Sequence, residues 1–198
     1  MIIGVSGKMG TGKDYFVENY IIKYIENTLK EKCLILSFAD MLKINLMVHH
    51  NVQLNELYGH KTPKIRELLQ QEGTEKGRNI HGEDIWIRYV KAWSELYNSR
   101  GIKYIIIPDV RFKNEYQFIK ENNGIVFRMH APNRNNKRLL EENNNNYDIK
   151  NHQSEIDLDD VEFDIIVEND NNSKEYNSKE YNSNYYYNIL SRYLVKSE

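Results

Sequence analysis

Five short runs of apolar or β-branched residues recur along the chain, and longer amphipathic stretches separate them. The runs cover residues 2–5, 33–38, 104–108, 124–129 and 163–168. Because the runs are almost continuously apolar instead of alternating with polar residues, they predict strands that are buried on both faces of a sheet.

The stretches between the runs predict helices, because their apolar residues recur at helical spacing. They cover residues 14–29, 63–71, 83–96 and 115–121, and a last helix is predicted near 187–194. Strands that alternate with helices predict an α/β fold, in which helices cover both faces of a five-stranded parallel sheet. We expect all 198 residues to form one domain, with ligands bound beyond the carboxyl ends of the strands.

Two segments have an unusual composition. Residues 133–146 are rich in asparagine, and residues 172–186 repeat a five-residue unit, NSKEY. A period of five matches neither a helix nor a strand, so the low-complexity region at about 170–186 predicts a solvated surface insertion that takes no part in the chemistry.

Charge and cysteine content narrow the class of function. The 27 lysine and arginine residues nearly balance the 29 aspartate and glutamate residues, which gives a formal net charge of -2. Without a global positive field, nucleic acid is not expected as a partner. Apolar runs stay well below the ~20 residues of a membrane span, so no membrane partner is expected. The only cysteine, Cys33, cannot form an internal disulfide, and we expect a cytoplasmic protein.

The first apolar run leads directly into a glycine-rich segment, GVSGKMGTGKDYF. Gly7, Gly10 and Gly12 expose backbone N–H groups that can surround a phosphate, and Lys13 can neutralise its charge. A strand before the segment and an amphipathic helix after it are the context of a phosphate-binding loop, or P-loop. The alternative is a glycine turn without a ligand.

The residue after Lys13 departs from the usual P-loop pattern, in which a Ser or Thr hydroxyl binds magnesium. Asp14 stands at that position. A carboxylate can bind Mg²⁺ directly or through a water, so this change does not by itself disable the site. Alternatively, Asp14 caps the first helical turn and faces its dipole.

A second carboxylate for magnesium is expected at the end of a neighbouring strand. Asp109 fits, because Pro108 cannot donate a ladder hydrogen bond and is predicted to end its strand, so that Asp109 points out of the sheet. Asp109 could instead cap the helix that follows. Arg111 can reach the same phosphates or pair with Asp109.

The segment IRELLQQEGTEKGR predicts a pocket for the phosphate acceptor. Arg66 and Gln70 lie one turn apart on a single helix face, and Arg78 follows later. Gly73 and Thr74 are predicted to end the helix. Arginine side chains suit a monophosphate, and an amide can bind a base or a ribose. An exposed helix of mixed charge is the alternative.

In combination, several motifs resemble the deoxynucleoside monophosphate kinases of large DNA phages and viruses: SGKMGTGKD, LSFADMLK, RELLQQEGTEKGR, PDVRFKNE and HQSEID. More distantly, the chain is similar to animal-type phosphomevalonate kinases, whose P-loop also ends in Lys-Asp. The resemblance covers most of residues 1–169. It implies a P-loop NTPase fold with three α/β/α layers, like that of nucleoside monophosphate kinases, in which Asp14 is the family's own variant of the loop.

The resemblance also implies a role for individual residues. The phosphates of ATP would lie on Gly7, Lys8, Gly10, Thr11, Gly12 and Lys13, with Mg²⁺ near Asp14 and Asp109. The acceptor would bind in the region of about 40–90, against Asp40, Lys43, Arg66, Gln70, Gly73, Thr74 and Arg78. Trp86 would lie near the nucleotide base, or else anchor the helix 83–96 from a buried position.

A lid is expected at about 130–150. Arg128, Arg134 and Arg138 are cations that can stabilise the transferring phosphoryl group, as an arginine finger does. The asparagine-rich insertion departs from the family pattern here, so a solvated charged loop is the alternative. His152 and Glu155 are predicted to support the lid.

The sequence therefore predicts an enzyme that transfers the γ-phosphoryl group of ATP, with Mg²⁺, to a deoxynucleoside monophosphate. Its predicted catalytic residues are Lys13, Asp14, Asp109, Arg111, Arg128 and Arg134. The alternatives are a phosphomevalonate kinase and a nucleotide-binding protein without catalysis. The resemblance makes a homodimer an expectation, and a viral member of the family would act in the host cytoplasm.

Overall fold

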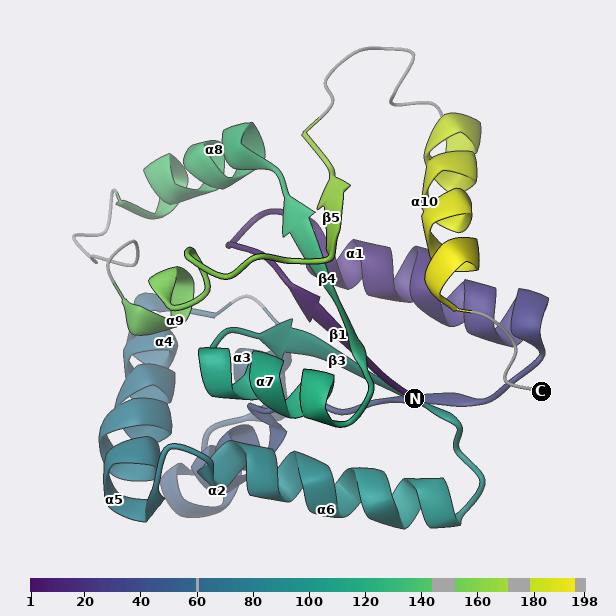
Figure 1. The fold of residues 1–198 in the computed structure, drawn as a ribbon. Coiled ribbons are helices and arrows are strands. Elements are labelled where there is room, and N and C mark those ends of the chain that lie inside the picture. The colour runs from purple at the N-terminus through teal and green to yellow at the C-terminus, as the bar shows by residue number, and fades with distance from the viewer. Residues whose placement is uncertain (60, 144–151, 171–178, 195–198) are drawn as a thin grey trace.

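The structure, a computed structural model, describes residues 1–59, 61–143, 152–170 and 179–194 (Figure 1). Its five strands are β1 (Ile2–Ser6), β2 (Cys33–Ile35), β3 (Tyr104–Val110), β4 (Ile125–His130) and β5 (Ile165–Glu168). They form one parallel sheet in the order β2-β3-β1-β4-β5. Each strand overlaps one of the five predicted runs, so the α/β fold with a five-stranded parallel sheet is confirmed.

The first half of the chain contributes helices α1 (Lys13–Phe16), η1 (Val17–Ile21), η2 (Tyr24–Leu29), α2 (Asp40–His50), α3 (Leu54–Tyr58), α4 (Pro63–Gln70), η3 (Gln71–Arg78), α5 (Asn79–His81) and α6 (Ile85–Ser99). The second half contributes α7 (Lys113–Glu121), α8 (Pro132–Asn143), α9 (Gln153–Ile156) and α10 (Lys179–Tyr193). The η segments are π-helical continuations of their neighbours. Among the described residues, no helix has the length and apolarity that a membrane span needs.

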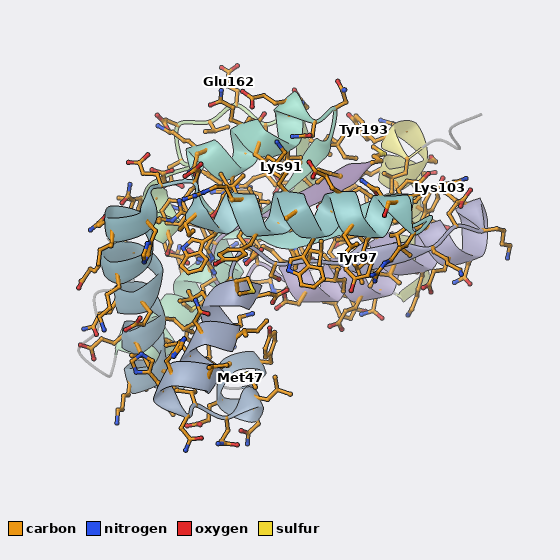
Figure 2. All side chains as sticks on the ribbon, turned by 90° about the horizontal axis from the view of Figure 1, so that it is seen from below. Met47, Lys91, Tyr97, Lys103, Glu162 and Tyr193 are labelled. Carbon is orange, nitrogen blue, oxygen red and sulfur yellow. The ribbon has the colours of Figure 1, made fainter. Side chains whose placement is uncertain are left out.

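Helices cover both faces of the sheet, which gives three α/β/α layers. Side chains from α1, η1, η2 and α10 pack on one face together with Ile106 of β3. Side chains from α2, α6 and α7 pack on the other face together with Ile105 and Ile107. Successive residues of a strand point to opposite faces, so this two-sided burial explains why the runs are continuously apolar. Seen from below, α6 runs along the second layer and carries Lys91 and Tyr97 (Figure 2).

A smaller helical unit lies beside the second layer. Leu46 of α2, Leu57 of α3 and Ile65 of α4 form its own apolar cluster with Val52. Thr62 begins α4, because its hydroxyl accepts the N–H of Ile65 and a proline follows it at the first helical position. This unit carries most of the predicted acceptor segment.

The prediction that Pro108 ends its strand is wrong. β3 continues to Val110, and its register with β1 shifts between the pairs Gly4–Ile107 and Ser6–Val110. The shift places Pro108 and Asp109 in an irregular part of the ladder, where a missing N–H breaks no regular pairing.

The prediction that Gly73 and Thr74 end a helix is also wrong. The helix that begins at Pro63 continues through η3 and α5 as far as His81. The glycines serve close packing instead, because a Cβ at Gly77 would lie 2.5 Å from Cζ2 of Trp86. A Cβ at Gly73 would lie 3.0 Å from Leu42.

The repeat is more ordered at its C-terminal end than its period suggests. Helix α10 begins at Lys179, whereas the sequence predicts a helix only from about 187. Tyr186, inside the repeat, is buried in the first layer with Leu190 and Leu194. Burial of one face overrides the weak helical pattern of the repeat, as tertiary packing commonly does. Residues 171–178 of the low-complexity region lie outside the described residues.

Candidate active site

The glycine-rich segment between β1 and α1 has the conformation of a phosphate-binding loop. Gly7, Gly10 and Gly12 have φ angles of +152°, +80° and +86°, a region that favours glycine. A Cβ at Gly7 would also lie 2.7 Å from Oγ1 of Thr11. Thr11 is buried and donates to the carbonyl of Lys8, which closes the loop.

Lys13 lies at the centre of this loop. Its ammonium group donates to the carbonyl of Gly7 at 2.7 Å. Burial lowers the pKa of Lys13 to about 8, and the positive charges of Arg111 and Arg128 act in the same direction. A bound polyphosphate would reverse this shift, because opposite charge favours the protonated lysine.

Asp14 lies in the first turn of α1, next to Lys13. Gly12 occupies the N-cap position of this helix, so the alternative that the side chain of Asp14 caps it is wrong. A negative charge in the first turn still lies favourably in the field of the helix dipole.

A cavity of about 740 Å³ opens between the phosphate loop and the acceptor helices. It is lined by these predicted residues: Lys13, Asp14, Asp40, Lys43, Arg66, Gln70, Gly73, Thr74, Arg78, Trp86, Asp109, Arg111, His152 and Glu155. The predicted acceptor and magnesium residues thus meet in one space, although they come from four separate segments. Arg128 and Arg134 do not belong to the described lining, and the side chain of Arg138 lies outside the described residues.

Asp109 connects β3 to the loop before α2. Its two carboxylate oxygens accept the N–H groups of Phe38 and Ala39, each at 3.0 Å. Burial raises the pKa of Asp109, whereas these two N–H groups act in the opposite direction. Asp109 therefore fixes the turn that leads into α2, whereas the start of α7 is closed by Glu115, which accepts the N–H groups of Arg111 and Phe112.

Arg111 forms an ion pair with Glu155, which comes from the short helix α9. The other oxygen of Glu155 accepts the N–H of Met9 in the phosphate loop at 3.4 Å. Glu155 thus joins the phosphate loop to the loop after β3.

Arg128 lies within β4 and pairs in the sheet with Ser6 at the end of β1. It donates to Oγ of Ser6 at 2.9 Å and pairs with Asp159 at 3.3 Å. Lys8 pairs with the same aspartate at 2.6 Å. Arg128 therefore connects β1 to the segment that follows α9.

Arg134 projects from the first turn of α8 toward the phosphate loop. A methyl group at Gly12 would lie 3.5 and 3.7 Å from its two terminal nitrogens. The start of α8 is fixed by Asp170, whose carboxylate accepts the N–H groups of Asn133 and Arg134 at 2.6 and 3.0 Å. Of the predicted lid arginines whose side chains are described, Arg134 is the one beside the glycine-rich loop.

The acceptor wall contains two side chains, those of Tyr58 and Lys61, that were not among the predicted site residues. Tyr58 donates to Asp40 at 2.8 Å, and Nζ of Lys43 lies 4.0 Å from the centre of its ring. Lys61 also lines the cavity, and burial lowers its pKa, with the charges of Lys43 and Arg66 acting in the same direction. The helix-start signal Thr-Pro directly after Lys61 could have located it at the mouth of the acceptor helix.

Arg78 and Trp86 are more buried than their predicted roles require. Arg78 pairs with Glu115 at 2.5 Å, and its guanidinium group lies 3.9 Å from the ring centre of Phe112. The indole of Trp86 is 6% exposed and donates to the carbonyl of Gly73 at 2.9 Å. Of its two readings, the buried anchor is the one that these contacts support, although both side chains also line the cavity.

The residues present fit a magnesium ion that uses substrate phosphates as ligands. Mg²⁺ keeps several waters and binds protein through one or two carboxylates, and Asp14 and Asp109 line the same cavity as Lys13. Within the described ranges, no group of three or more His, Cys, Asp or Glu side chains could enclose a metal by itself. The donor set therefore suits an ion that enters with a phosphate-bearing substrate.

A parallel sheet in this order, a glycine-rich loop before α1 and a cavity at the carboxyl ends of the strands that is lined by both cations and carboxylates are the features of a P-loop kinase fold. The family model for phosphomevalonate kinase matches residues 5–124, and the chain belongs to this family. It is therefore a phosphotransferase whose substrate carries a phosphate group.

Two individual proteins are also similar. One is a protein of Acanthamoeba polyphaga mimivirus named "Putative deoxynucleotide monophosphate kinase", with 26% identity over 147 residues, covering 67% of this chain and 75% of the viral one. The other is the solved structure of APE1195, with 12% identity and a TM-score of 0.44, covering 98% of this chain and 97% of that one.

Proposed function

We propose that this kinase transfers the γ-phosphoryl group of ATP to a deoxynucleoside monophosphate. The observation that carries the proposal is the composition of the cavity wall opposite the phosphate loop. Cationic side chains of Lys43, Lys61 and Arg66 lie beside the apolar or aromatic groups of Phe38, Leu42, Leu69 and Trp86. A monophosphate suits the cations, and a base suits the apolar surface.

The proposed roles follow the position of each group. Lys13 and the N–H groups of the loop bind the β- and γ-phosphates, and Arg134 lies over Gly12 to stabilise charge on the transferring group. Mg²⁺, which would neutralise charge on the phosphates, would be held by Asp14 and Asp109. Arg111 lies between the two substrates. Alignment and charge neutralisation suffice for this transfer, so the residues need not form a covalent intermediate.

Phosphomevalonate is the second candidate acceptor. The family match over residues 5–124 favours it, and a small acidic phosphate would also satisfy the cations of the wall. It would leave the apolar part of the wall without a partner. The name of the mimivirus relative supports the nucleotide instead.

A coupled assay of ADP release tests the proposal. The panel contains the deoxynucleoside monophosphates, the corresponding ribonucleotides and phosphomevalonate, each with ATP and Mg²⁺. We expect turnover with at least one deoxynucleoside monophosphate. Turnover with phosphomevalonate alone would overturn the nucleotide assignment. If no acceptor increases the release of ADP, both proposed acceptors would be wrong.

A further inference from the structure

The tyrosine-rich end of the repeat packs against the helix that follows the phosphate loop. Helix α10 stands beside α1 and its continuation (Figure 1). The ring of Tyr186 lies 4.3 Å from that of Tyr20 and 5.1 Å from that of Phe16, measured between centroids. Tyr187 packs less deeply, 5.8 Å from Tyr24. The repeat thus supplies part of the core directly behind the phosphate loop.

A chain of two hydrogen bonds runs from this helix to the loop. The hydroxyl of Tyr186 donates to Oδ1 of Asn169 at 2.9 Å. The Nδ2 atom of Asn169 in turn donates to the carbonyl of Thr11 at 2.8 Å. The backbone N–H of Asn169 is fixed as well, because it donates to the carbonyl of His130 at 2.8 Å.

The Thr11 carbonyl and the Tyr186 hydroxyl together hold one orientation of the Asn169 amide. An asparagine side chain can rotate to exchange its oxygen and its nitrogen, and only the nitrogen can donate to a carbonyl. Tyr186 is 4% exposed, and burial raises its pKa to about 12, so its hydroxyl stays protonated at neutral pH. Because the Thr11 carbonyl can only accept, Nδ2 faces it, and Oδ1 is left to accept the hydroxyl of Tyr186, which holds the amide in this orientation.

The bond to Thr11 fixes a peptide group of the phosphate loop. In a trans peptide the C=O and the following N–H point in opposite directions. When the carbonyl of Thr11 points to Asn169, the N–H of Gly12 points away from it. Space on the Asn169 side is tight, because a Cβ at Gly12 would lie 2.6 Å from Nδ2. Gly12 can therefore accept this neighbour only because it lacks a side chain.

We propose that Tyr186 is a positioning residue for the phosphate loop: through Asn169 it fixes the Thr11–Gly12 peptide in the orientation that presents the N–H of Gly12 to a bound phosphate. This inference rests on the proposed function in one respect, namely that the loop binds ATP. It gives the last part of the repeat a role in substrate binding.

Tyr186→Phe tests the inference, because it keeps the ring in its packed position and removes only the donor. Tyr187→Phe is the matched control, one position further along the same helix. We expect Tyr186→Phe to raise the Kd for ATP about three- to tenfold, measured by calorimetric titration without an acceptor, as for the loss of one neutral hydrogen bond. The KM of the acceptor and the thermal midpoint should stay close to those of the parent.

A double-mutant cycle separates positioning from packing. In an Asn169→Ala background, Tyr186→Phe should cause no further loss of ATP affinity, because its only route to the loop is gone. An unchanged Kd in the single variant, or the same loss in both backgrounds, would overturn the inference. Failure of the unaltered protein to bind ATP would overturn the proposed function first, and this result is visible before any variant is made.

Discussion

The phosphate loop and the acceptor wall line the same cavity, but the loop is one continuous segment and the wall is built from several. The loop takes most of its shape from adjacent residues, since the three glycines with positive φ and the lysine that donates to Gly7 all lie within residues 7–13, and distant contacts such as that of Asn169 orient single peptides in it. The wall is assembled from segments far apart in the chain, namely the loop before α2, the helix α4 and the loop after β3. Asp109 joins β3 to the loop before α2. We therefore expect one substitution in the phosphate loop to impair turnover strongly, whereas several cations of the acceptor wall share the binding of the acceptor.

Loss of Lys13 should have the largest effect, because its ammonium group lies against the Gly7 carbonyl inside the loop, whereas Lys8 of the same loop pairs with Asp159. We expect Lys13→Ala to lower kcat at least ~100-fold, since this charge acts most strongly on the transition state. Steady-state turnover and the thermal midpoint are the measurements, and the midpoint should not fall. The control is Lys23→Ala, which removes an exposed lysine of the same layer. Near-normal turnover of Lys13→Ala would show that the loop is not the catalytic phosphate site.

Loss of Arg66 should affect one substrate only. We expect Arg66→Ala to raise the KM of the acceptor up to ~100-fold, since a lost charge-assisted phosphate contact costs at most about 3 kcal/mol. The KM of ATP should change little, because Arg66 belongs to the opposite wall. Arg88→Ala, at an exposed pair with Asp84, is the control. An equal rise in both KM values would show that the two regions are not separate sites.

Asp14→Asn tests the predicted metal site between the phosphate loop and the acceptor wall. Asparagine keeps the shape of the side chain but removes a negative charge from the surroundings of the metal. We expect a several-fold higher magnesium concentration for half-maximal turnover and an unchanged thermal midpoint. Glu26→Gln removes an exposed carboxylate from the continuation of the same helix and should leave the magnesium dependence as it is. An unaltered requirement in Asp14→Asn would leave Asp109 as the predicted metal ligand.

The smallest effect concerns pH. The pKa of Lys13 in the empty site is lowered to about 8, and bound ATP would raise it. Lys13 is therefore protonated below this pH and loses its proton as the pH rises through 8, so ATP affinity should fall in that direction. We expect the Kd for ATP to increase about twofold between pH 7 and pH 8. The same titrations of Lys13→Ala measure how the protonation of ATP alone changes the Kd. An equal change of the Kd with pH in both proteins would contradict the assignment of this pH dependence to Lys13.

The features that could be predicted from the sequence are those that depend on residues close together in the chain. Continuous apolar runs located all five strands, because burial on both faces leaves no polar alternation. The glycine spacing identified the phosphate loop, because its shape follows from φ angles that few other residues adopt. Asp109 could also be selected, since residues at the ends of parallel strands meet at one edge of the sheet, and Arg66 could be selected from its helical spacing to Gln70; both line the cavity.

Features that depend on contacts between distant segments of the chain are visible only in the folded structure. Pro108 remains within β3 because the register shift with β1 absorbs its missing N–H. Gly73 and Gly77 lie inside a helix because Leu42 and Trp86 need the space beside them. The end of the repeat is helical because Tyr186 packs on Phe16 and Tyr20, which lie more than 150 residues earlier in the chain. Such contacts release free energy only when both partners are folded, and a local pattern cannot encode them.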